Sequence, residues 1–310
     1  MKQIKAFAPA TVANVACGFD VLGFALDQPG DTCTITLKDQ PGIIIKSITG
    51  DEGKLPLDPA QNTISLVISE YLKAIGKEEL GVEIELQKGM PLKSGLGSSA
   101  ASSVVGVYAL NKLLGEPLAQ ADLLPFAMEG ERLACGSAHA DNVAPALMGG
   151  FVLVRSYAPL DTVKLPTPSK LYATVIHPHI EVKTQDARSI LRQEIQLKEA
   201  VNQWGNLGGL IAGIYTEDYP LIGRSLTDSI VEPVRSLLIP GFDKTKEEVL
   251  KAGALGCSIS GSGPSIFALS DSKETAQKVA DKMQSVYNKL NIQNEVFISK
   301  VNSEGPRIID

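Results

Sequence analysis

The sequence contains few of the side chains that bind transition metals. Its 310 residues include three histidines and four cysteines, and no two cysteines have Cys-x-x-Cys spacing. We therefore expect Cys17, Cys33, Cys135 and Cys257 to be reduced, mostly buried small hydrophobes of a cytosolic protein. The histidines do not form a plausible zinc set, because His139 is remote in sequence and we expect His177 and His179 to face apart.

Long hydrophobic runs and an excess of positive charge are also missing. No apolar run approaches the ~18–20 residues of a membrane span, and the first residues lack the apolar core of a signal peptide. The net charge is −6 and the pI about 5.3, whereas phosphate-backbone binding needs clustered Lys and Arg. We expect a cytoplasmic globular protein that binds neither a membrane nor a nucleic acid.

The sequence does contain a glycine-rich turn that leads into a helix, at residues 91–101, PLKSGLGSSAA. The first four N–H groups of a helix have no partner inside it, so they form an anion site. Gly95 and Gly97 let the backbone approach a phosphate, and Ser98 and Ser99 can cap the helix or reach a metal ion. The turn predicts a nucleotide or another phosphorylated ligand.

Three alternatives apply to this turn. It is not a Walker A motif, because its only lysine, Lys93, precedes the glycines. Gly95-x-Gly97-x-x-Ala100 fits a loose dinucleotide fingerprint, but a separate turn at Lys88–Pro91 lies between the preceding strand and the first glycine. An ordinary glycine turn with a serine cap also remains possible.

The first half of the chain alternates strand and helix patterns, and the second half is strand-rich at its end. Strands are predicted at Ile4–Ala8, Thr32–Lys38, Gly42–Ile48, Val82–Gln87, Phe151–Arg155, Leu171–Ile176, Cys257–Ser260, Ser265–Leu269 and Glu295–Lys300. Helices are predicted at 64–75, from Ser98 to near Gly115, at Leu123–Cys135, within 185–228 and at about 272–289. Three prolines in 157–170 predict a domain boundary, which we place between residues 165 and 166. The pattern indicates an α+β fold of two domains.

Three polar or glycine-bearing segments stand out, at residues 9–23, 91–101 and 253–265. They resemble motifs one, two and three of the GHMP kinase superfamily. The narrower resemblance is to the homoserine kinases, and it rests on Asn14 with Gly18-Phe19-Asp20, on 139–145 (HADNVAP), on Thr184-x-x-Ala187-Arg188, and on Glu232-Pro233-x-Arg235 followed by 238–242 (LIPGF). These landmarks span nearly the whole chain in the family's order.

The resemblance implies a fold, a reaction and an assembly. The N-terminal domain (1–165) would be of the ribosomal-protein-S5 domain-2-like type and the C-terminal domain (166–310) ferredoxin-like, with the site between them. ATP would phosphorylate the side-chain hydroxyl of L-homoserine, a step of threonine biosynthesis. Mg²⁺ would assist, and the protein would be a homodimer.

The resemblance also assigns the ATP and metal sites. The predicted ATP-binding residues are the turn residues together with two residues outside it: Pro91, Lys93, Ser94, Gly95, Leu96, Gly97, Ser98, Ser99, Ala100, Ala101, Asn62 and Thr184. For Asn62, which precedes a helix, a plain helix cap is nearly as good an explanation as contact with adenine. A hydroxyl of Ser98 or Ser99 and the Glu131 carboxylate would bind the metal.

Homoserine is a zwitterion, so its site must supply both a cation and an anion. Arg188 and Arg235 can recognise a carboxylate, and Asp20 can pair with the ammonium. Asn14 and Asn142 can hydrogen-bond the hydroxyl end, and Gly261 lies in the third motif, which would pack against the turn. His139 is expected to be structural.

The sequence does not decide whether the reaction uses a catalytic base. Some members of the superfamily use an aspartate, whereas Asn142 occupies the corresponding place here and Asp141 is adjacent. A loose transition state needs little help from a base, so we favour Asn142 as an orienting group over Asp141 as a base.

Other functions remain possible from the sequence. They are a GHMP kinase for mevalonate or shikimate, a non-catalytic nucleotide sensor and a dinucleotide-dependent oxidoreductase. A kinase for mevalonate or shikimate would leave Asp20 without an ammonium to pair with. A nucleotide sensor would not need Glu131 and the paired serines. Pro91, in the turn before the glycines, argues against the oxidoreductase.

Overall fold

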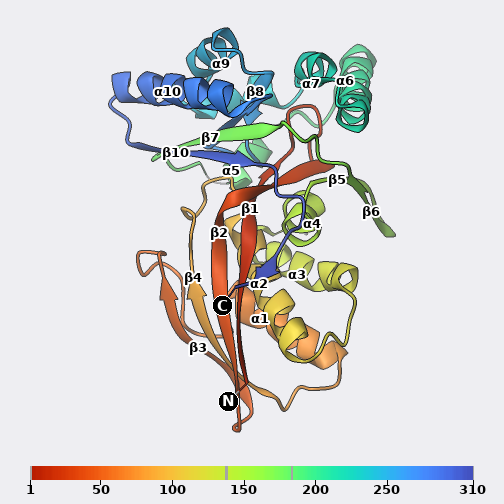
Figure 1. Cartoon of the computed structure of the whole chain (residues 1–310), viewed down its shortest axis with the longest axis vertical. Coiled ribbons are helices and arrows are strands. Elements are labelled where there is room, and N and C mark those ends of the chain that lie inside the picture. The colour runs from red at the N-terminus through yellow and green to blue at the C-terminus, as the bar shows by residue number, and fades with distance from the viewer. Residues whose placement is uncertain (1, 137–138, 183, 310) are drawn as a thin grey trace.

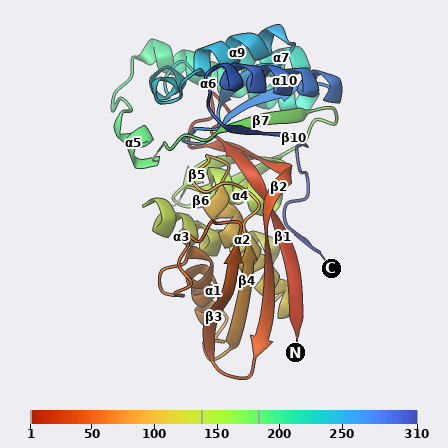
Figure 2. The ribbon, with the colours of Figure 1, turned by 90° about the vertical axis from the view of Figure 1, so that its left-hand side faces the viewer.

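The computed structural model describes residues 2–136, 139–182 and 184–309. It has two layered α+β parts, one above the other in Figures 1 and 2. Among the described residues, no helix is long and apolar enough to cross a membrane. The predicted α+β fold is confirmed.

The N-terminal part is a sheet covered by helices on one face. Its strands run in the order β11-β1-β2-β4-β3, and β5 and β6 extend the sheet from β2. The strands are β1 (Gln3–Ala13), β2 (Leu22–Lys38), β3 (Gly42–Thr49), β4 (Gly81–Gln87), β5 (Phe151–Tyr157), β6 (Leu160–Leu165) and β11 (Arg307–Ile308). The covering helices are α1 (Thr63–Ala74), α2 (Ser98–Leu113), α3 (Leu124–Cys135) and α4 (Ala140–Met148), with a short 3-10 helix at Gln120–Leu123.

Helix α2 is the central helix of this part. Its residues are small or apolar on nearly every side, and it packs against β1 and β2 as well as α1 and α3. A helix without a polar face is stable only when it is buried all round, which confirms the prediction for this segment. The glycine-rich turn at residues 91–101 therefore leads directly into a buried helix.

The C-terminal part is a four-stranded antiparallel sheet in the order β10-β7-β9-β8. Its strands are β7 (Tyr172–Pro178), β8 (Gly256–Ile259), β9 (Ile266–Ser270) and β10 (Asn294–Lys300). Helices α9 (Phe242–Lys251) and α10 (Lys273–Lys289) cover it, and α5 (Thr184–Ser189), α6 (Leu197–Thr216), α7 (Tyr219–Ser225), α8 (Glu232–Arg235) and a 3-10 turn at Ser236–Leu238 complete this part.

Two details differ from the sequence predictions. Residues 157–165 are not a linker, because β5 and β6 form a hairpin there, from Phe151 opposite Leu165 to Tyr157 opposite Leu160. Pro159 lies in the turn of this hairpin and Pro166 directly follows its second strand. These prolines explain why the sequence of this segment resembles a domain boundary. After β10 the chain returns to the N-terminal part, where β11 pairs with β1 and Val301 with Leu26. The division at 165/166 stays a prediction, and this last segment crosses it.

Candidate active site

The glycine-rich turn (residues 91–101), which is predicted to bind phosphate, lies where the two parts meet. Gly97 is the N-cap of α2, with a left-handed φ of 66°, and no side chain caps the helix. The serine-cap alternative is therefore wrong. A Cβ on Gly97 would collide with the Thr11 hydroxyl and approach the Asn142 amide oxygen to 2.9 Å, so glycine is needed for both its conformation and its space.

The two serines after Gly97 have different surroundings. The Ser99 hydroxyl donates a hydrogen bond to the Glu131 carboxylate, which is 5% exposed. The Ser98 hydroxyl is buried and has no hydrogen-bond partner. A buried hydroxyl without a partner is costly, unless a ligand supplies one. These hard oxygen donors beside a phosphate site fit Mg²⁺, which is usually held by one or two carboxylates and by substrate phosphates.

A buried ion pair contacts the first turn of α2, directly after the glycine-rich turn. The Lys88 ammonium contacts the Asp31 carboxylate and donates to the Ser98 carbonyl at 2.8 Å and the Ser102 hydroxyl at 2.7 Å. The side chains of Lys88 and Asp31 are 1% and 0% exposed. The backbone N–H of Gly89 also donates to Asp31, at 3.0 Å. The pair ties the strand before the turn to the helix after it.

Lys93 has a different position from Lys88. Its side chain is exposed and pairs with Glu181 at 2.9 Å.

The two predicted ATP-binding residues outside the turn are Asn62 and Thr184. Asn62 is buried as the N-cap of α1, where it accepts from Ile64 N and donates to Pro56 O. The helix-cap explanation of Asn62 is thus confirmed, and its contact with adenine stays a prediction. The side chain of Thr184 lies outside the described residues.

The third motif packs on the turn, as expected. The Ser260 hydroxyl donates to Gly95 O at 2.7 Å, and Ser265 N donates to Ser94 O at 3.2 Å. A Cβ on Gly95 would lie 2.5 Å from Ser260 O. The contact leaves no space for any larger residue at position 95.

Gly261, in this third motif, links the turn region to two predicted substrate-binding side chains. Its carbonyl accepts from the Asn14 amide at 2.7 Å and the Arg235 guanidinium at 3.1 Å. Its N–H donates to Ala13 O at 3.2 Å. Motifs one and three therefore meet at Gly261.

Gly261→Val is expected to lower turnover roughly tenfold while the KM for ATP changes little. The residue has a φ of 57°, and a Cβ there would lie 3.2 Å from Gly95 O. A β-branched side chain is strained at this φ, and the carbonyl would shift away from Arg235. Steady-state kinetics would measure both constants. Gly115→Val is the control, since Gly115 also has a positive φ but lies in open space. An unchanged kcat would remove this loop from the site.

Two arginines, one aspartate and one aromatic ring, which include three of the predicted substrate-binding residues, form one cluster. Arg188 Nη2 lies 2.9 and 3.0 Å from the two oxygens of Asp20. Arg235 is 4% exposed and donates from Nε to Ala187 O at 3.0 Å. The Phe19 ring lies 5.6 Å from the guanidinium of Arg188 and 5.0 Å from that of Arg235, distances at which cations are attracted to an aromatic ring.

The sequence reasoning gave no role to Phe19, Tyr157 or Thr11. The Tyr157 hydroxyl donates to Asp20 O at 2.8 Å and accepts from Ala140 N at 3.3 Å. Thr11 donates to the Asn142 amide oxygen at 2.8 Å. Phe19 and Thr11 lie inside the quoted first motif, so their place there is the only signal that could have identified them.

Asp141 lies next to Asn142 but is enclosed. It is 3% exposed, and its Oδ1 has no hydrogen-bond partner. Burial, with smaller contributions from the charges of Asp20 and Glu131, raises its pKa to about 7. His139, the N-cap residue of α4, has a lowered pKa, chiefly because of burial.

Asp141→Asn is expected to keep substantial activity and to change the pH dependence of stability. As pH rises from 3.8 to about 7, the unfolded chain loses this proton while the folded chain keeps it. The carboxyl therefore lowers the free energy of unfolding progressively across this window, and the asparagine variant should lack that slope. Urea unfolding at several pH values measures it, with Asp271→Asn, an exposed residue, as control. A collapse of kcat with intact substrate binding would instead make Asp141 the base.

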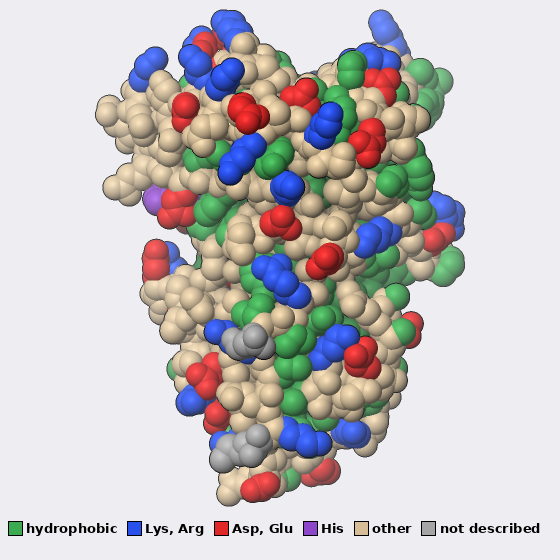
Figure 3. Space-filling model, in the orientation of Figure 1, with side chains coloured by type: hydrophobic (Ala, Val, Ile, Leu, Met, Phe, Trp, Pro, Cys, Tyr) green, Lys and Arg blue, Asp and Glu red, His purple; other side chains and the backbone are tan. Residues whose placement is uncertain are grey.

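A cavity of about 480 Å³ adjoins the start of the glycine-rich turn. It is lined by the loop after β3 (Gly50–Glu52, Lys54), by 88–92, and by His177, His179 and Glu295 of the C-terminal part. The left edge of Figure 3 is indented at this level, below a histidine. Its volume lies in the usual range for small-molecule sites.

The two histidines of this cavity do not face apart, so that expectation is wrong. Their ring centroids are 5.6 Å apart, because His179 directly follows β7, which contains His177, and residues two apart along an extended chain share a face. Burial lowers the pKa of His177 to about 4, and its Nδ1 lies 3.2 Å from the Ser265 hydroxyl. Among the described residues, no group of three or more His, Cys, Asp or Glu is placed so that it could hold a metal ion.

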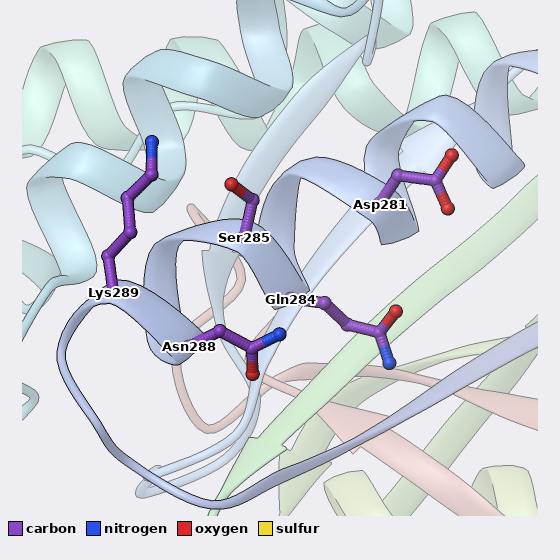
Figure 4. Close-up of a pocket in the computed structure, with 5 residues that line it drawn as sticks. All are labelled: Asp281, Gln284, Ser285, Asn288 and Lys289. Carbon is purple, nitrogen blue, oxygen red and sulfur yellow. The ribbon is translucent and has the colours of Figure 1, made fainter.

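A second depression lies on α10, away from the domain junction. Figure 4 shows its lining residues on this one helix, where their side chains do not converge: Asp281, Gln284, Ser285, Asn288 and Lys289. It has no connection to the residues described above.

Comparison with known proteins agrees with this geometry. The family models described as GHMP kinases N terminal domain and GHMP kinases C terminal match residues 62–150 and 210–289. The fold and the site thus define a GHMP kinase.

Individual relatives show which branch of the GHMP kinases this chain belongs to. A homoserine kinase of Chlorobium phaeovibrioides is 52% identical over the full length of both chains, and one of Xylella fastidiosa is 37% identical over 99% of this chain and 94% of its own. A crystal structure of homoserine kinase from Cytophaga hutchinsonii has 64% identity and a TM-score of 0.97, covering 100% of this chain and 98% of its own. The chain belongs to the homoserine kinase family.

Proposed function

We propose that the protein transfers the γ-phosphoryl group of ATP to the side-chain hydroxyl of L-homoserine, giving O-phospho-L-homoserine for threonine biosynthesis. The observation that best supports this proposal is the contact between motifs at Gly261: its carbonyl accepts from Asn14 and Arg235, and the neighbouring Ser260 donates to Gly95 in the glycine-rich turn. The cytoplasmic location and the homodimer belong to the same proposal.

The nucleotide would bind along the domain junction. Backbone N–H groups of residues 95–99 and the positive end of the α2 dipole would hold the phosphates. The 480 Å³ cavity at the start of the turn would accept the base. Glu131, with Ser98 or Ser99, would hold Mg²⁺, which would neutralise phosphate charge when bound.

The amino acid would bind on the opposite side of the turn. Arg235 and Arg188 would take its carboxylate and Asp20 its ammonium, while Asn142, held by Thr11, would orient the hydroxyl. The bond from this oxygen to phosphorus would form as the bond to the leaving ADP oxygen breaks. Since little negative charge must develop on the attacking oxygen of a loose transition state, its proton needs no dedicated base and would pass to an oxygen of the transferred phosphoryl group.

ADP release measured with five acceptors tests the proposal. L-homoserine would be compared with L-threonine, L-serine, mevalonate and shikimate. We expect kcat/KM for L-homoserine to exceed that for mevalonate and shikimate by at least about 10²-fold, because they leave Asp20 unpaired. Activity only with a carboxylate that lacks an amine would overturn the proposal, and no ADP release with any acceptor would favour a nucleotide sensor.

A further inference from the structure

The loop between β1 and β2, which carries Phe19 and Asp20, begins with a strained backbone. Asn14, Val15 and Ala16 have φ values of 71°, 40° and 58°, so three successive residues lie in the left-handed region. A β-branched residue with such a φ is an outlier, and strained residues of this kind persist only where their surroundings determine the conformation. Contacts from outside the loop must therefore hold this turn in place.

Two contacts that hold the end of the turn come from the C-terminal part. Gln203 Nε2, on α6, donates to Cys17 O at 3.2 Å. The Cys17 thiol donates to Ser225 O, at the end of α7, at 3.3 Å. Figure 1 shows this loop, in red, extending from the N-terminal part toward α6 and α7. Helix α6 thus takes part in fixing a loop of the other part of the protein.

The same glutamine side chain contacts a buried aspartate. Gln203 Nε2 donates to Asp228 Oδ1 at 2.9 Å, and Gln203 Oε1 accepts from Ser229 N at 3.2 Å. Asp228 is 6% exposed, and its carboxylate also accepts from three successive backbone N–H groups, at residues 230–232. A carboxylate in this position satisfies N–H groups that have no partner at the start of a helix, which here is α8.

Helix α8 places Arg235 in the cluster. It is a single turn of four residues, and Arg235 is its last residue. A turn this short is not stable by itself, so the position of Arg235 depends on what holds the start of α8. Asp228 holds it through the three N–H groups. From the other end of α8, the Arg235 guanidinium reaches Gly261 O and the Phe19 ring.

We infer that Gln203 and Asp228 form a clamp that positions the substrate-binding cluster from two sides. The glutamine holds the loop that carries Phe19 and Asp20, and the aspartate holds the helix that carries Arg235. Both act through other residues, so they are positioning residues and not catalytic ones. The inference rests on the proposed function, which assigns this cluster to the carboxylate and ammonium of L-homoserine. None of the contacts described for the clamp involves the glycine-rich turn, so its effect should be confined to the amino acid.

Initial rates of ADP release test the clamp with Gln203→Met, which keeps the length of the side chain but loses its hydrogen bonds. The KM for L-homoserine should rise about tenfold, whereas kcat and the KM for ATP should change less than about twofold. The reason is that the lost contacts position groups that bind the amino acid equally in the ground state and the transition state. Asp228→Asn removes one of the oxygens that accept from the start of α8, and it should raise the same KM at least about threefold.

Asn206→Leu is the matched control. Asn206 lies on the same helix and also donates to the loop before α8, to Thr227 O at 3.0 Å, but this hydrogen bond reaches neither Cys17 nor Asp228. Both KM values of this variant should equal those of wild type. Circular dichroism and thermal unfolding would establish that each variant is folded.

Three results would overturn the clamp while wild type phosphorylates L-homoserine. They are an unchanged KM for L-homoserine in Gln203→Met, an equal rise in the Asn206→Leu control, and a parallel rise in the KM for ATP, which would indicate a general loosening of the domain junction. A wild type that releases no ADP with L-homoserine would instead overturn the proposed function, and with it the role given to the clamp.

Discussion

Glu131→Gln is expected to lower kcat by about 10²–10³-fold, or about 3–4 kcal/mol of activation free energy. Its carboxylate accepts a hydrogen bond from the hydroxyl of Ser99, the residue after Ser98, whose own buried hydroxyl has no partner; phosphate and metal charges would meet at these serines. The amide keeps the size of the side chain but loses the charge that attracts a divalent cation. Kinetics across Mg²⁺ concentration would show a raised apparent KM for the metal as well.

Glu129→Gln is the matched control for this substitution. Glu129 lies on the same helix but pairs at the surface with Arg132, at 2.7 Å, and such pairs contribute little. Its kcat should equal that of wild type. If Glu131→Gln retained full turnover in a folded protein, Glu131 would not take part in the reaction.

Lys88→Met is expected to destabilise the fold by about 3–5 kcal/mol, since it leaves the Asp31 carboxylate buried without its cation. It should also raise the KM for ATP, because Lys88 no longer holds the Ser98 carbonyl at the first turn of α2. Urea unfolding measures the first effect and initial rates the second. Lys38→Met, which removes a partly exposed pair with Glu83, should cost less than about 1 kcal/mol.

A double variant separates the two roles of Lys88. Adding Asp31→Asn removes the uncompensated charge and should recover much of the stability, while the amide oxygen can still accept from Gly89. The raised KM should persist, because the contact with Ser98 is still missing. Full recovery of both would show that Lys88 acts only on stability.

The helices and strands whose signals lie in the local sequence were predicted best. Helix α10, from Lys273 to Lys289, could be recognised because its apolar positions repeat at helical spacing. Helix α2 could be recognised because it lies between two glycines, Gly97 and Gly115, and its residues are small or apolar almost all round. Strands β1 and β2 are longer than predicted, since Pro9 and Pro29 interrupt their apolar pattern. Helix α4 was missed for a similar reason, because Pro145 lies inside it.

The site was predicted in part. Residues near one another in sequence, such as Gly97 and Ser98, can be grouped from the chain alone, and the meeting of the three motifs followed from the resemblance. The pairing of Asp20 with Arg188 joins positions 168 residues apart, which spacing cannot show. The Lys88–Asp31 pair also escaped notice, because both residues flank the strands predicted from the sequence, and a lysine and an aspartate in such places are usually solvated.

The return of the chain to its first strand affects how the protein can be divided. Asn302 N donates to Ala25 O and Ile309 N to Lys5 O, at 2.9 Å each. The N-terminal sheet, whose first strands are synthesised first, is therefore completed only by the last residues of the chain. A fragment cut at the predicted boundary would lack this edge strand and expose unpaired backbone of β1. Recombinant dissection of the two halves would therefore need residues 301–309 grafted onto the first half.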